Sequence, residues 1–247
     1  MRIIPARGSL LLAFPALLFA ACSPNGQQAD GDAPAAQASS MSTPSAGDGW
    51  RPLFDGRTTA GWHAFGGGAP GAGWQVVDGA LTRAGQAGDI LTDEEFGSFE
   101  LELEWKIQPG GNSGVFFHVV EDSSLQYVWQ TGSEMQVLDN AGHADGRQPN
   151  TSAGSNFALY APARDATRPA GQWNAARLVV RGDHVEHWLN GEKLLEYELG
   201  SAEWRQRVAA SKFGEMPRYG LARRGHIALQ DHGDAVSFRN IRIRVLP

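Results

Sequence analysis

The chain has 247 residues, of which 42% are hydrophobic and 19% are charged, with 21 lysines and arginines against 27 aspartates and glutamates. The net charge of −6 and the lack of any run of basic residues argue against a nucleic-acid partner. The single cysteine, Cys22, excludes an intrachain disulfide and a cluster of thiolate metal ligands.

The first 21 residues have the organisation of a secretion signal. Arg2 and Arg7 precede an apolar run, Ser9–Ala21, which is about as long as a signal core and too short to span a bilayer. The run ends in Phe-Ala-Ala-Cys, which resembles a bacterial lipoprotein cleavage site. We therefore predict a signal peptide over residues 1–21 and lipidation of Cys22, with a plain secretory signal as the alternative. The expected location is the bacterial cell envelope, lipid-anchored, facing the periplasm or at the outer membrane.

Residues 22–47 consist mainly of Ala, Ser, Gln, Gly, Pro and Asp and hold almost no large apolar side chain. Such a segment cannot bury enough surface to offset its ordering entropy, so we predict a disordered tether with a reach of about 25–30 Å. Loss of residues 1–21 removes two arginines, so 19 basic residues (21 − 2) face 27 acidic ones, a net charge of −8. The 200 residues of Asp48–Pro247 (247 − 47) suit a single all-β domain.

Short strand patterns joined by tight turns fill this domain. Asp78-Gly79 and Asn190-Gly191 are two-residue hairpin signals. In Phe99–Ile107 hydrophobic residues alternate with Glu or Lys, which predicts one face in the core and one in solvent. Ser113–Glu121 is hydrophobic on both faces apart from His118, which predicts a central strand. Further strand patterns lie at 50–56, 59–65, 74–77, 80–83, 89–92, 157–160, 172–181, 184–189, 192–199 and 225–230.

One segment, Ser201–Phe213, has helical character and begins with a serine cap. In the last strand the hydrophobic parity changes near Arg239-Asn240, which predicts a β-bulge. Some twelve short strands with one helix predict an all-β fold, a two-sheet jelly-roll sandwich with one short helical insertion.

The stretch Gly132–Gly146 is the first candidate for a functional site. Period-two alternation sends Met135 and Val137 into a core and leaves Glu134 and Gln136 on the opposite, open face. The loop that follows carries four further polar candidates, which are Asp139, Asn140, His143 and Asp145. A carboxylate and an amide on an open strand face, next to acids and an imidazole, are suited to proton transfer and substrate binding.

Other polar and aromatic residues are candidates for the opposite walls of such a site. By parity His118 and His226 share the open face, although each histidine has a purely structural interpretation as well. Lys212 lies at the end of the predicted helical segment, where it either polarises a ketone or lies on the surface. Gln230, Asp231 and His232 form a polar turn that either reaches the site or only closes a hairpin, and Trp129 could stack on a sugar ring.

A metal is a weaker expectation. Asp139, His143 and Asp145 offer oxygen and nitrogen ligands at loop spacing, so a divalent ion is conceivable, but they lack the twelve-residue pattern of a calcium loop. No cofactor is firmly predicted.

Several segments together resemble one known family. They are LFDGRTTAGWHAF at 53–65, NSGVFFHV at 112–119, EMQVLDNAGHADG at 134–146, WN at 173–174, HWLNG at 187–191, SKF at 211–213 and IALQDHGDAVSFRNIRIR at 227–244. In this order they resemble the 3-keto-disaccharide hydrolase domain family, over essentially all of Asp48–Pro247. The resemblance implies a fold similar to that of concanavalin A-like lectins and glucanases. It also implies a carbohydrate substrate, a glycoside whose sugar a separate sugar 3-dehydrogenase has oxidised at C3.

The implied chemistry starts from the C3 ketone, which acidifies the proton on C2. A base removes that proton, the glycosidic oxygen leaves by elimination, and added water gives net hydrolysis. Glu134, Lys212, His118, Asp139 and His232 are the candidates for base, polariser and acid.

Two other functions remain open at this point. Glu134-x-Gln136-x-x-Asp139 resembles the Glu-x-Asp-x-x-Glu strand of laminarinase-type retaining glucanases, although the central acid is Gln and the last is the shorter Asp. A non-catalytic carbohydrate-binding lipoprotein is the second alternative, because lectins use the same fold.

Overall fold

The structure is a computed structural model that describes residues 48–247. The predicted signal peptide (1–21), the tether (22–47) and the lipidation of Cys22 therefore lie outside the described residues. Within residues 48–247 the elements are β1 (Trp50–Pro52), β2 (Trp62–Ala64), β3 (Trp74–Val77), β4 (Ala80–Arg83), β5 (Ile90–Phe96), β6 (Phe99–Ile107), β7 (Asn112–Val119), β8 (Ser133–Leu138), β9 (Asn174–Arg181), β10 (His184–Leu189), β11 (Glu192–Glu198), α1 (Ala202–Ala209), β12 (Gly225–Leu229) and β13 (Val236–Val245).

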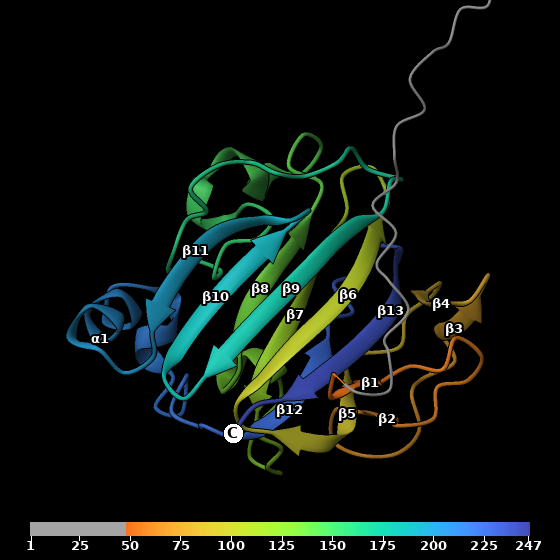
Figure 1. Cartoon of the computed structure of the whole chain (residues 1–247), viewed down its shortest axis with the longest axis horizontal. Helices are drawn as coiled ribbons and strands as arrows, with labels where there is room; N and C mark the ends of the chain where they lie inside the picture. The colour runs from red at the N-terminus through yellow and green to blue at the C-terminus, as the bar shows by residue number, and fades with distance from the viewer. Residues whose placement is uncertain (1–47) are drawn as a thin grey trace, which may run out of the picture. The chain divides into compact units, whose positions relative to one another are not determined.

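The strands form two antiparallel sheets. The eight-stranded sheet has the order β11-β10-β9-β6-β13-β4-β3, with β1 paired to β13, and the five-stranded sheet has the order β2-β5-β12-β7-β8. Figure 1 shows β11, β10, β9, β6 and β13 as one layer, with β8, β7 and β12 in a second layer behind it. The all-β sandwich with one short helix is confirmed, and so is the central place of the 113–121 strand, which lies between β12 and β8.

The hydrophobic core fills the space between the sheets. Leu101, Leu103 and Trp105 of β6 face Val115 and Phe117 of β7, and all are at most 1% exposed. Both hairpin predictions are confirmed, because Asp78-Gly79 and Asn190-Gly191 have positive φ angles at both residues, as a type I′ turn requires.

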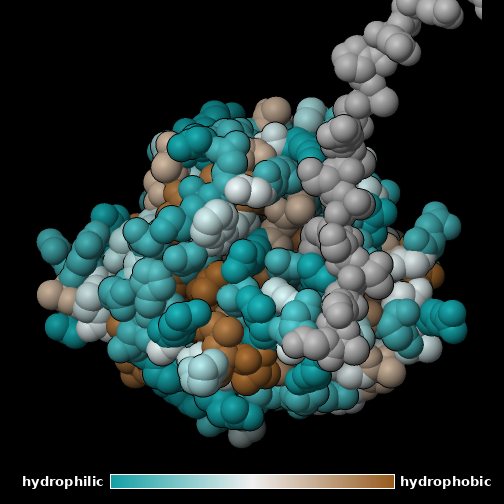
Figure 2. Space-filling view, viewed as in Figure 1, coloured by the Kyte–Doolittle hydropathy of each residue, from teal (hydrophilic) through white to brown (hydrophobic). Residues whose placement is uncertain are grey.

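The outer face of the eight-stranded sheet differs from the prediction that it is simply solvated. Glu100 is only 5% exposed, because Arg177 and Arg244 donate to its Oε2 from the neighbouring strands at 2.7 and 2.8 Å. Arg239 and Arg242 pair in the same way with Glu104 and Glu102. Figure 2 shows this face as largely hydrophilic. The glutamates of β6 are therefore held beneath a layer of arginines.

Three local predictions can be compared with the structure. The β-bulge is confirmed by a register shift between Arg239 and Arg242, with Asn240 at a φ of 53°. The helical segment is shorter than predicted, because α1 ends at Ala209 and a separate 3-10 turn covers Lys212–Glu215. The strand expected at 157–160 is wrong, since only isolated bridges form there. No helix among residues 48–247 is long and apolar enough to cross a membrane.

Candidate active site

Glu134 and Gln136 project from the face of the five-stranded sheet that lies away from the core, as their parity predicts. Met135 and Val137, their neighbours, belong to the core. This outer face is not open, because Glu134 is 5% exposed and Gln136 is 1% exposed. The segment after β8 folds back along this strand, so that Phe157 donates its N–H to the carbonyl oxygen of Glu134 at 3.1 Å.

Gly114 of β7 determines where the Glu134 carboxyl lies. Gly114 pairs with Gln136, and Phe116 pairs with Glu134, across the β7–β8 ladder. A β-carbon on Gly114 would collide with Oε1 of Glu134, so the carboxyl lies flat over the glycine. The missing side chain of Gly114 therefore lets Glu134 reach toward the middle of the sheet.

The environment of Glu134 favours its protonated form. Burial raises the pKa of Glu134 to about 8, the positive charge of Lys212 opposes this rise, and the charges of Asp89 and Asp145 reinforce it. No hydrogen bond or ion pair joins Glu134 to Lys212 within residues 48–247, so the two groups are neighbours without direct contact. At neutral pH Glu134 is mostly a neutral acid beside a cation.

Lys212 lies over aromatic rings at the edge of the site. Its Nζ is 4.3 Å from the ring centre of Phe157 and 5.1 Å from that of Phe213. Partial burial lowers the pKa of Lys212, and the charges of Glu134 and Asp145 oppose that effect. The residue as a whole is exposed, and its ammonium group is held over the aromatic rings.

Asp89 is a candidate that the sequence analysis missed. It directly precedes β5, and its Oδ1 accepts the N–H of Asp231 at 2.9 Å. Burial raises the pKa of Asp89 to about 6. The negative charge of Asp231 also raises this pKa, whereas the hydrogen bond from the Asp231 N–H lowers it. A lone aspartate at a strand boundary gives no sequence signal, and only the strand order brings it near Glu134.

Asp139 has a structural role that the two-carboxylate interpretation does not allow for. Its Oδ2 accepts the N–H of Gly110 at 2.7 Å, and its Oδ1 accepts the N–H of Ala141 at 3.2 Å. The acids that influence the pKa of Glu134 are Asp89 and Asp145, not Asp139. A Glu134–Asp139 pair of the laminarinase type is thus not supported, because Asp139 caps the loop that follows β8.

His118 lies on the opposite face from the one that its parity predicts. Its φ of 54° breaks the strand alternation. The ring is buried in the core, with Nε2 2.9 Å from the carbonyl oxygen of Gly97 and its edge against Phe99 and Phe117. Burial lowers the pKa of His118. We therefore correct the open-face placement of His118 to a structural one.

His226 is on the outer face but toward the other end of the sheet. It pairs with Val119, three residues along β7 from the partner of Glu134. Its Nδ1 is 2.7 Å from the carbonyl oxygen of Thr92, and its ring contacts His63 edge-on at 5.4 Å. The structure therefore separates His226 from the Glu134–Lys212 centre by roughly 10 Å of strand.

Two residues of the turn after β12, Gln230 and Asp231, have different surroundings. The N–H of Gln230 donates to the carbonyl oxygen of Gly114, which places Gln230 beside the glycine that carries the Glu134 carboxyl. The buried Oε1 atoms of Gln230 and Gln136 have no hydrogen-bond partner among the described residues. Asp231 instead binds Arg83 and the backbone of residues 87 and 88, which corrects its predicted substrate role to a structural one.

The loop after β8 brings His143 toward His232. Their rings lie edge-on at 6.5 Å, and Nδ1 of His143 accepts the N–H of Asp145 at 3.1 Å. Asn140 uses its Oδ1 to hold the backbone of Ala153, a structural contact. Among residues 48–247, Asp139, His143 and Asp145 do not bring three ligand atoms together, so the weak metal expectation at this loop is not supported.

Trp129 forms an aromatic surface beside Lys212. It stacks on Tyr127 with ring centres 4.8 Å apart and planes 8° apart, and Tyr127 is 47% exposed. Nζ of Lys212 lies 5.9 Å from the Trp129 ring. The sequence analysis missed Tyr127, which no strand or turn pattern distinguishes.

Comparison with known proteins places this chain in a family. A curated 3-keto-disaccharide hydrolase from Bacteroides thetaiotaomicron is 34% identical over 243 residues, covering 86% of this chain and 83% of that protein. A crystal structure from Parabacteroides distasonis, described as a candidate glycosyl hydrolase, is 35% identical with a TM-score of 0.76 and covers 81% of this chain and 94% of its own. A Bacillus subtilis protein with a galectin-like fold is 14% identical with a TM-score of 0.50, covers 79% of this chain and 94% of its own, and shows the fold alone. The model of the 3-keto-alpha-glucoside-1,2-lyase-like domain matches residues 49–244, and the chain belongs to this family of glycoside-cleaving domains.

Proposed function

We propose that this protein cleaves glycosides whose sugar carries a ketone at C3, by elimination followed by addition of water. The observation that carries the proposal is Glu134, a buried carboxyl that is protonated at neutral pH and lies beside Lys212 without pairing to it. An acid and a separate cation are two of the three groups that an elimination from a keto sugar requires, and the third is a base for the C2 proton. The name of the Bacteroides relative supports the same substrate class.

The proposed steps assign a role to each titrating group. Asp89, whose pKa of about 6 leaves it ionised at neutral pH, removes the proton from C2. The electron pair moves onto the C3 oxygen, where the Lys212 ammonium stabilises the enolate. The enolate then returns its electrons to form the C1–C2 double bond while the C1–O bond breaks, and Glu134 donates its proton to the departing oxygen. Water then adds across the C1–C2 double bond: its oxygen bonds to C1 as it gives a proton back to Glu134, and C2 takes back the proton held by Asp89, which completes a net hydrolysis.

Substrate binding follows from the residues around this centre. The exposed ring of Tyr127 continues the Trp129 surface, on which a sugar ring can stack. We propose that His143 and His232 border the same site at the loop end of the strands.

We also propose an extracytoplasmic location, with attachment through lipidated Cys22. This rests on the apolar run that ends at Cys22 and on the composition of residues 22–47. The substrate chemistry requires an upstream oxidation by a sugar 3-dehydrogenase, because an ordinary glycoside has no C3 ketone.

The deciding experiment compares a 3-keto-disaccharide with its unoxidised parent as substrates of the purified protein. We expect consumption of the keto sugar only, and a loss of about 10²–10⁴-fold in kcat in E134Q. E203Q is the matched control, because Glu203 lies on α1 and pairs with Arg207. Equal rates on both sugars, or an E134Q variant as active as E203Q, would refute the proposal.

A further inference from the structure

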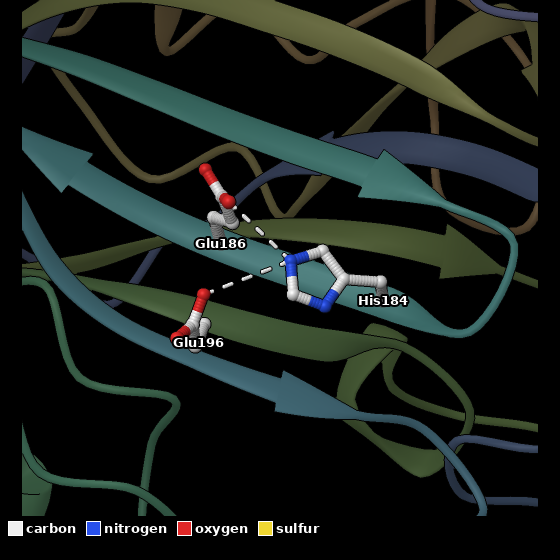
Figure 3. Close-up of side chains that lie close together, drawn as sticks. All are labelled: His184, Glu186 and Glu196. Atoms are coloured by element: carbon white, nitrogen blue, oxygen red, sulfur yellow. Dashed lines mark hydrogen bonds and ion pairs between the residues drawn. The ribbon is translucent and has the colours of Figure 1, made fainter.

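A second group of titratable side chains lies on the outer face of the eight-stranded sheet, on the two strands at its edge. The register of β10 and β11 places His184 opposite Glu198 and Glu186 opposite Glu196. Since residues two apart in a strand share a face, all four side chains project to the same side. Figure 3 shows His184, Glu186 and Glu196 turned toward one another across the two strands.

The separations suit a metal ion. Nε2 of His184 lies 3.3 Å from Oε1 of Glu186 and 3.8 Å from Oε2 of Glu196, and one ligand atom from each residue lies within 4.8 Å of the others. Tetrahedral zinc with bonds of roughly 2.1 Å holds its ligand atoms roughly 3.4 Å apart. We propose that His184, Glu186 and Glu196 bind a divalent transition-metal ion of the zinc class.

Neighbouring hydrogen bonds orient two of these ligands. Oε1 of Glu198 lies 2.7 Å from Nδ1 of His184 and accepts its proton, which fixes the ring with Nε2 toward the two glutamates, where Nε2 coordinates the metal after it gives up its own proton. Nε1 of Trp188 donates to Oε2 of Glu186 at 2.7 Å and leaves Oε1 directed at His184. Carboxylates that hold a histidine, and donors that hold a carboxylate, are the usual outer contacts of protein metal sites.

The charge balance also favours a cation. The group holds three glutamates, Glu186, Glu196 and Glu198, and one lysine. Nζ of Lys193 lies 2.8 Å from Oε2 of Glu196 and 3.7 Å from Oε1 of Glu186. Lys193 therefore occupies the position of a counter-ion and competes with the metal for the same oxygens. A doubly charged ion coordinated by the histidine as well would displace it.

The position leaves coordination sites open. His184, Glu196 and Glu198 also line a surface groove of about 700 Å³ whose other walls are Tyr160 and the beginning of α1. Three protein ligands with a free position toward a groove leave room for water or a small ligand on the metal. The site lies on the other sheet from Glu134 and is independent of the proposed glycoside cleavage.

Isothermal titration of the purified, untagged protein with ZnCl₂ tests the proposal. We expect one bound ion per chain with a Kd below roughly 100 µM. H184A and E196Q should each weaken binding at least about tenfold, and E198Q about tenfold to a hundredfold through the orientation of His184. Lys193→Met should tighten binding roughly two- to fivefold, because it removes the competing charge.

E192Q is the matched control, because Glu192 lies on the same strand and pairs with Arg164 outside the cluster. Thermal unfolding of each variant checks that its fold is intact. One-site binding that E192Q retains and H184A loses supports the proposal. Absence of binding in the unaltered protein, or binding that H184A leaves unchanged, would overturn it.

Discussion

Replacement of Glu134 by glutamine tests the burial of this carboxyl through its effect on stability. The amide has nearly the same shape and cannot ionise. Burial raises the pKa of Glu134 to about 8 from an ordinary value of 4.5. The native state therefore holds a proton that the unfolded chain releases between these two values, so stability is full below pH 4.5 and declines as the pH rises through about 8.

The magnitude follows from the size of this shift. About 3.5 units at about 1.36 kcal/mol each give a decline of roughly 5 kcal/mol across the window, which is an upper value because the native site can relax. E134Q lacks this decline. Asp89 titrates in both proteins, so its contribution cancels in the comparison.

Guanidinium unfolding at pH 5, 7 and 8.5, followed by tryptophan fluorescence, measures the difference. We expect E134Q and the unaltered protein to differ little at pH 5, and E134Q to become the more stable by several kcal/mol at pH 8.5. If the free energies of unfolding of the two proteins stay parallel over this range, Glu134 titrates normally and the argument for a buried acid fails.

Three further predictions address the neighbours of this residue and the arginine layer. Activity on a keto sugar should rise through about pH 6 and fall through about pH 8 in a pH–rate profile, as Asp89 ionises and Glu134 loses its proton, and D89N should lower kcat by about 10²–10⁴-fold. Gly114→Ala should push the Glu134 carboxyl aside and lower kcat about 10–100-fold, whereas Gly182→Ala, in an exposed turn, should leave kcat unchanged. Glu100→Gln should destabilise the fold by about 1–3 kcal/mol in chemical unfolding, since Arg177 and Arg244 both lose their carboxylate partner; an unchanged unfolding midpoint would contradict this.

The two-sheet sandwich and one wall of the candidate site could be predicted from the sequence. Period-two alternation correctly placed Met135 and Val137 in the core and Glu134 on the other face, because burial of one face fixes strand register. The Asp78-Gly79 and Asn190-Gly191 turns and the bulge near Arg239 follow from equally local rules.

The errors arise where long-range contacts override the local pattern. His118 adopts a positive φ, which alternation cannot anticipate, and so turns into the core. Glu100 lies beneath arginines that come from strands far away in the chain. Asp89 influences the pKa of Glu134 because β5 and β8 belong to one sheet, a pairing of distant segments that no single-sequence pattern encodes.

The number of carboxyls available at the site decides between ordinary glycoside hydrolysis and elimination from a keto sugar. Retention in an ordinary glycosidase needs two carboxyls roughly 5–5.5 Å apart, with one as nucleophile. Asp139, the residue that its spacing offers for that role, accepts two backbone N–H groups and caps a loop. A ketone at C3 removes the need for a nucleophile, because it makes the C2 proton acidic and stores the resulting charge on an oxygen. What remains to be supplied is a base, a cation for that oxygen and a proton for the leaving group. We propose Asp89, Lys212 and Glu134 for these three requirements. Burial raises the pKa of Asp89 and of Glu134, which suits a base and an acid that work near neutral pH, whereas burial lowers the pKa of Lys212 and the charges of Glu134 and Asp145 favour its ammonium form.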